Sequence, residues 1–125
     1  MAALNELALT LVASVPGVDM QAVAKTILYT VPSGKTCYIF AIIVRNTSAS
    51  LAGGTEYDFG DDANCTTWLQ NVDLSLLTTA TTDYKIVTSL TSFAYCAAGA
   101  EFGIKPITGS TAAATATLDV IGYLV

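Results

Sequence analysis

The sequence predicts an all-β fold, a single-domain antiparallel β-sandwich of the jelly-roll type, on three observations. Seven to eight short segments show the alternation or the short apolar run of a β-strand. Pro, Gly, Asn and Asp separate these segments at roughly regular spacing, and no long helical pattern interrupts them. The chain has 125 residues, which fits one hydrophobic core and leaves no room for a second.

The N-terminal region, residues 1–15, is predicted to be an extended arm or edge strand, followed by the sandwich domain in residues 16–125. Leu7, Leu9 and Leu11 alternate as in a strand, although the same region also fits one face of a helix. Such an arm could add a strand to the sheet of a neighbouring chain, because backbone pairing places few demands on sequence.

Turn formers set the limits of the later elements. A turn is expected at Pro16-Gly17, with room for one short helical turn in 18–24, and a second turn at 32–35, where Pro presets φ and Gly accepts positive φ. Pro106 is expected to end a strand. The predicted strands cover residues 26–31, 36–46, 55–59, 67–69, 84–90, 93–97, 101–105 and 115–125.

The segment 36–46 is apolar on both predicted faces, which is typical of a central strand covered on both sides. One side would face the core, and the other a covering loop or a partner subunit. Strict alternation separates Cys37 and Ile43 from Tyr38 and Val44, and the pattern leaves open which set points outward. The candidate interface residues are Leu7, Leu9, Leu11, Tyr38, Phe40, Ile42, Ile43, Ile121, Tyr123 and Val125.

The composition favours a protein that shares apolar surface with other chains. Hydrophobic residues make up 53% of the sequence and charged residues only 12%, against about a quarter charged in ordinary soluble domains. The mean hydropathy is +0.58. No apolar run reaches the roughly 18 residues of a membrane-spanning helix, and the basic start of a secretory signal is missing, so we expect neither membrane insertion nor export.

Catalysis, cofactors and nucleic acid are not expected. The sequence contains no histidine, which removes the commonest general base and the His cluster of metal-dependent jelly-roll enzymes. It also lacks a phosphate-binding glycine loop. The five basic residues are scattered and the net charge is −5, which argues against nucleic-acid binding. Three widely spaced cysteines suit neither a disulfide framework nor a zinc site, and we expect inert thiols.

An acidic turn supplies two weaker hypotheses. Asp58, Asp61, Asp62 and Asn64 offer oxygen ligands for Ca²⁺, but without EF-hand spacing, and a solvated loop is the preferred interpretation.

Tyr57 and Trp68 flank this turn, and aromatic rings beside carboxylates are typical of a sugar-binding face. The preferred interpretation of Trp68 is an anchor in the core or in an interface.

Two parts of the chain resemble small structural proteins of tailed phages. The first is TILYTVPSGKT at 26–36 with YIFAIIVRNTS at 38–48, where a Val-Pro-x-Gly-Lys turn leads into a long apolar strand and an Asn-Thr-Ser loop. The second is TATLDVIGYLV at 115–125, which is similar to the closing strand of those proteins.

This resemblance implies a virion component, assembled in the host cytoplasm. The expected role is a head decoration (cement) protein, commonly a homotrimer, that binds the major capsid protein and stabilises the head. A tail, collar or fibre accessory protein is the alternative within the virion. A carbohydrate-binding jelly roll remains as an alternative of another class.

Overall fold

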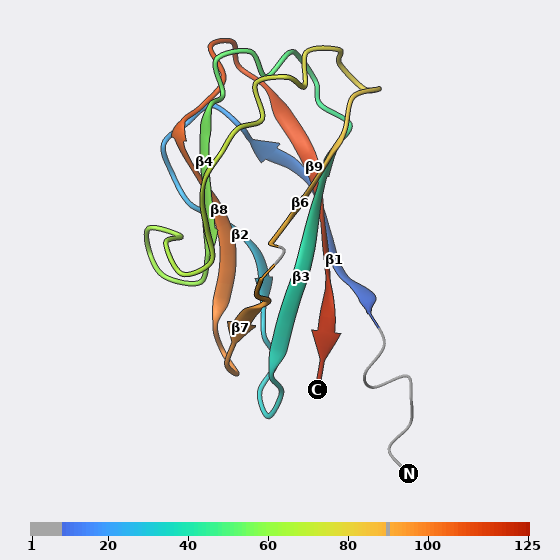
Figure 1. Cartoon of the computed structure of the whole chain (residues 1–125), viewed down its shortest axis with the longest axis vertical. Coiled ribbons are helices and arrows are strands. Elements are labelled where there is room, and N and C mark those ends of the chain that lie inside the picture. Colours follow the sequence, from blue (N-terminus) through green and yellow to red (C-terminus); the bar gives the residue numbers. More distant parts are fainter. Residues whose placement is uncertain (1–8, 90) are drawn as a thin grey trace.

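The computed structural model describes residues 9–89 and 91–125, which form two antiparallel sheets packed face to face (Figure 1). The first sheet has the order β1-β9-β3-β6, with β7 also paired to β3, and the second has the order β2-β8-β4-β5. The strands in these residues are β1 Thr10–Asp19, β2 Thr26–Thr30, β3 Cys37–Arg45, β4 Glu56–Gly60, β5 Leu69–Val72, β6 Lys85–Thr88, β7 Ala94–Cys96, β8 Glu101–Thr108 and β9 Thr115–Leu124. This part of the chain contains no helix, and so none that could cross a membrane.

The strand order is that of a jelly roll. Strands β1 to β4 alternate between the two sheets, and β9 returns to lie between β1 and β3. Because β6 and β7 both pair with β3, they act as one interrupted edge strand, and each sheet then has four strand positions. The predicted single-domain all-β sandwich is confirmed.

The core lies between the sheets and receives side chains from both. Its largest fully buried members include Ile39 and Leu118 from the first sheet, and Tyr57, Phe59 and Phe102 from the second. Burial on this scale is the main source of stability of the sandwich.

A β-bulge in β3 changes which residues face the core. Pairing with β9 shifts between Ile39 and Ala41, so Phe40 is an extra residue. Before the bulge Ile39 points inward, and after it Ile42 does, both with no exposed surface. The expected strict alternation along 36–46 is therefore wrong, and Ile42 belongs to the core and not to an interface.

The N-terminal boundary also differs from the prediction. Strand β1 runs through the expected turn at Pro16-Gly17, because a register shift between Val15 and Val18 accommodates both residues and Gly17 adopts a φ of +67°. The proposed division between residues 15 and 16 thus falls inside an edge strand. The expected helical turn is absent from 18–24, and Leu7 lies outside the described residues.

Pro106 does not end its strand, since β8 continues to Thr108. Strand β2 pairs only with residues 101–104 of β8, so at Pro106 the side of β8 that faces β2 has no partner strand. On its other side, Pro106 is opposite Tyr57 of β4. A proline without a ladder partner on one side is tolerated in a sheet. The short strand expected at 67–69 forms two residues later, as β5.

Candidate interaction surface

A row of three tyrosines crosses the outer face of the first sheet. Tyr38 on β3 pairs in register with Tyr95 on β7 and with Tyr123 on β9. Directly opposite residues in a sheet point to the same side, so the three rings lie next to one another. The Tyr38 and Tyr95 rings meet edge to face, with centroids 5.4 Å apart.

Two phenylalanines extend this row. The ring of Phe40, the residue displaced by the bulge, lies 5.5 Å from that of Phe93, and Phe93 lies 5.7 Å from Tyr123. Phe93 is 46% exposed and Tyr95 60% exposed. We call these five residues the aromatic face: Tyr38, Phe40, Phe93, Tyr95 and Tyr123.

The aromatic face is hollowed and borders further apolar side chains. Val125 lines a shallow depression together with Tyr38, Phe93 and Tyr123. Farther along the sheet, two cross-strand pairs continue the apolar surface, Leu11 with Ile121 and Ile43 with Ile86. Of the predicted interface residues within the described chain, Ile42 alone is fully buried.

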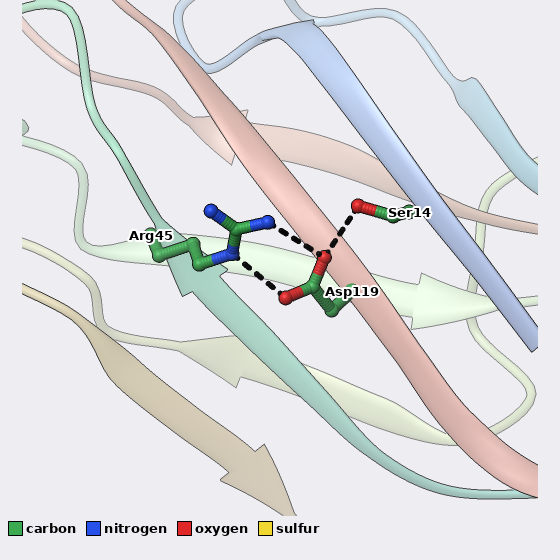
Figure 2. Close-up of polar contacts among 3 residues, drawn as sticks. All are labelled: Ser14, Arg45 and Asp119. Carbon is green, nitrogen blue, oxygen red and sulfur yellow. Dashed lines mark hydrogen bonds and ion pairs between the residues drawn. The ribbon is translucent and has the colours of Figure 1, made fainter. Parts of the chain in front are cut away.

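A polar cluster lies on the same outer face, where Asp119 is the register partner of Ile43. Figure 2 shows its three side chains, Ser14, Arg45 and Asp119. Asp119 on β9 accepts a hydrogen bond from Nε of Arg45 on β3 at 2.8 Å and one from the hydroxyl of Ser14 on β1 at 2.6 Å. The cluster therefore joins three adjacent strands, β1, β9 and β3. The hydrogen bond from Arg45 holds the pKa of Asp119 below its usual 3.8, against the opposing effect of burial.

The outer face of the second sheet differs, because the chain covers part of it with the loop 61–68. Gly60 on β4 and Gly103 on β8 are directly opposite each other. A Cβ at Gly60 would collide with the backbone and side chain of Thr67, and one at Gly103 with the carbonyl of Thr26. Gly60 thus lets the loop 61–68 lie against the sheet, and Gly103 lets β2 approach β8 closely.

Lysine side chains attach the loop 61–68 to this face. Lys25 donates from Nζ to the carbonyl of Asp62 at 3.0 Å, and Lys105 on β8 donates from Nζ to Oδ1 of Asn64 at 2.9 Å. The loop is visible beside β4 and β8 in Figure 1.

The predicted calcium ligands are each engaged separately. They accept hydrogen bonds from different donors, Asp58 from the N–H of Asn71, Asp61 from the hydroxyl of Thr67, Asp62 from Thr66 and Asn64 from Lys105. Among the described residues, no three His, Cys, Asp or Glu side chains are grouped to hold a metal ion. The structure therefore does not bring this set together as a calcium site.

The predicted sugar-binding pair is also separated. Tyr57 is fully buried, its hydroxyl donates to the carbonyl of Met20 at 2.7 Å, and burial raises its pKa to about 12. Tyr57 is therefore unavailable to a ligand, and its assignment to a sugar-binding face is wrong. Trp68 is half-buried, packs at 5.9 Å from Phe102 and donates from Nε1 to the carbonyl of Ser92 at 3.2 Å.

Sequence reasoning missed Phe93, Tyr95 and Ile86, which complete the apolar surface. A signal was present, because Phe93 and Tyr95 alternate with Ala94 and Cys96 and so belong on one side of a strand. That these rings meet Tyr38 depends on β7 pairing with β3, a contact between segments far apart in the chain.

Comparison with known proteins adds no relative. No protein-family model, no curated protein and no solved structure matches the chain.

Proposed function

We propose that the chain is a structural subunit of a tailed-phage virion, a head decoration protein that forms a homo-oligomer and binds the major capsid protein. The observation that carries the proposal is the aromatic face, on which five rings share one side of a sheet and two of them, Phe93 and Tyr95, are strongly exposed. Contiguous exposed apolar surface of this kind is typical of interaction sites, contacts between protein chains among them.

Two further observations support the proposal, the composition and the sequence resemblance. The low charge content and positive mean hydropathy suit a protein that buries surface in an assembly. The segments at 26–48 and 115–125, whose sequences resemble phage structural proteins, form or flank β2, β3 and β9, and the last two strands carry most of the aromatic face. Jelly rolls occur in capsid and lectin domains alike, so the fold alone does not select the function.

The first test measures the mass of the purified protein by light scattering, alone and after mixing with undecorated heads of the phage that encodes it. The proposal expects a stable oligomer, with the trimer as the specific expectation, that co-sediments with the heads. A monomer at every concentration that fails to co-sediment would overturn it. Binding to tails and not to heads would replace the decoration role with that of a tail, collar or fibre protein.

A pair of charge substitutions then locates the contact. Tyr95→Lys places a cation in the aromatic face at an exposed position, so the oligomer should dissociate while the urea midpoint of the monomer changes little. Ile27→Lys is the matched control, because Ile27 is 46% exposed on β2 of the other sheet, and the oligomer should persist. Equal behaviour of the two variants would rule out the aromatic face as the contact.

A further inference from the structure

The β7 strand brings two cysteines directly opposite each other inside the sandwich. Cys37 on β3 and Cys96 on β7 are register partners, and both thiols are free and fully buried. Since opposite residues point to the same face, the two sulfur atoms lie on the core side of the first sheet. The sequence separates these cysteines widely, so only strand pairing reveals the relation.

The hydrogen bonding of the neighbouring residues defines the type of pair. Thr36 and Val125 exchange two backbone hydrogen bonds, N–H to carbonyl at 2.9 and 2.8 Å. Successive residues of a strand direct their backbone groups to opposite sides, so those of Cys37 point toward β7. Cys37 and Cys96 therefore form a hydrogen-bonded pair, for which the Cα atoms are about 5.5 Å apart. Disulfides span Cα distances of roughly 4.4–6.8 Å.

We propose that Cys37 and Cys96 form a cross-strand disulfide when the protein meets a low-molecular-weight disulfide oxidant. Opposite Cβ atoms in a hydrogen-bonded pair are about 5.5 Å apart, against about 3.8 Å in a disulfide, so β7 must move toward β3 by about 1.5 Å. The bond is therefore strained and easily reduced.

The chemistry is thiol–disulfide exchange. One protein thiolate attacks oxidised glutathione, forms a mixed disulfide and releases one glutathione. The second protein thiolate attacks the protein sulfur of that mixed disulfide and releases the other glutathione. One S–S bond breaks and one forms, and the two thiol protons of the protein end on the two reduced glutathiones.

The consequence concerns the aromatic face. In the described residues, β7 is three residues long and is held in the sheet by pairing with β3 alone. It carries Tyr95, the outermost ring of the tyrosine row. A covalent link at Cys96 would fix the neighbouring Tyr95 against Tyr38, so oxidation would make the aromatic face more rigid. The disulfide does not depend on the proposed function.

The test treats the reduced protein with oxidised glutathione, in parallel with refolding in a glutathione redox buffer, because buried thiols react slowly. Tryptic cleavage suits the assay, since Cys37, Cys65 and Cys96 fall in different peptides, 36–45, 46–85 and 86–125, the bond before Pro106 being resistant. The expected result is a protein lighter by two hydrogens, with peptide 36–45 joined to peptide 86–125 and one free thiol remaining.

Cys65 provides the matched control. It is as buried as the other two cysteines, but it lies in the loop 61–68 and has no cysteine opposite it in a strand pair. Cys65→Ala should still lose both remaining thiols, whereas Cys96→Ala should form no intramolecular link. Three free thiols after both treatments, a stable glutathione adduct without the link, or a link that includes Cys65 would each overturn the proposal.

Discussion

The outer faces of the two sheets of the sandwich differ. The second sheet has paired glycines at Gly60 and Gly103, and the loop 61–68 lies against it, attached through Lys25 and Lys105. The first sheet instead presents the aromatic face, with Tyr95 60% exposed. A domain that covers part of one sheet with its own chain and leaves aromatic rings exposed on the other has one side suited to a partner.

The largest effect is expected inside the first sheet, where the bulge separates adjacent residues. Ile42→Ala should lower the free energy of unfolding by about 3 kcal/mol, because it leaves a cavity in the core. Ile43→Ala, one residue on but on the outer face, should cost less than about 1 kcal/mol. Urea unfolding of both variants measures the difference, and equal losses would contradict the bulge.

A smaller effect is expected on the covered sheet. Gly103→Ala should cost about 2 kcal/mol, because the new methyl group would meet the backbone carbonyl of Thr26 and force the segments apart.

Gly34→Ala is the control for Gly103→Ala, since Gly34 has open space around it. Only its φ of +76° strains an alanine there, so the free energy of unfolding should fall by about 1 kcal/mol. Thermal unfolding of the two variants gives the ranking, and a harmless Gly103→Ala would mean that β2 does not approach β8 closely at this position.

The smallest effect comes from the polar cluster of the first sheet. Asp119→Asn should lower the free energy of unfolding at neutral pH by only about 1 kcal/mol, because solvent around the 47% exposed Arg45 side chain weakens the ion pair. The folded pKa of Asp119 lies below its usual 3.8, so this stabilisation is present above that pH and is lost as the pH falls through the folded pKa.

The measurement is the urea midpoint of the wild type and of Asp119→Asn between neutral and strongly acidic pH, where the two should converge. Ser14→Ala, which keeps the pair with Arg45, should show a smaller loss. A difference that stays constant across the pH range would assign the effect to packing and not to charge.

Much of the fold was predictable because strands carry local signals. The strand at 26–31, the turn at 32–35 and the long strands at 36–46 and 115–125 appear close to their expected positions. Local patterns failed where register decides the outcome, as at Ile42, which a single extra residue turned inward. They also failed at Pro16-Gly17. The composition of these residues predicts a turn, but a β-bulge lets β1 continue through them as one strand.

The candidate surface was predictable in part, for a related reason. Tyr38, Phe40 and Tyr123 lie in long strands with strong patterns, and the prediction included them. Tyr57 was misplaced because an aromatic residue beside acidic side chains has the same local pattern whether its ring points to solvent or to the core. Its buried hydroxyl bonds to Met20, a residue remote in sequence.

The position of Trp68 has a consequence for spectroscopy. As the only tryptophan, it dominates the intrinsic fluorescence of the chain. Its contacts with Phe102 of β8 and with Ser92, between β6 and β7, place the indole on the seam where the two sheets meet. If the sheets separate at that seam while the strands stay intact, the fluorescence emission of Trp68 would shift and the far-UV circular dichroism of the strands would remain. Disagreement between the two signals would thus report a partly opened sandwich, and coincident transitions an all-or-none one.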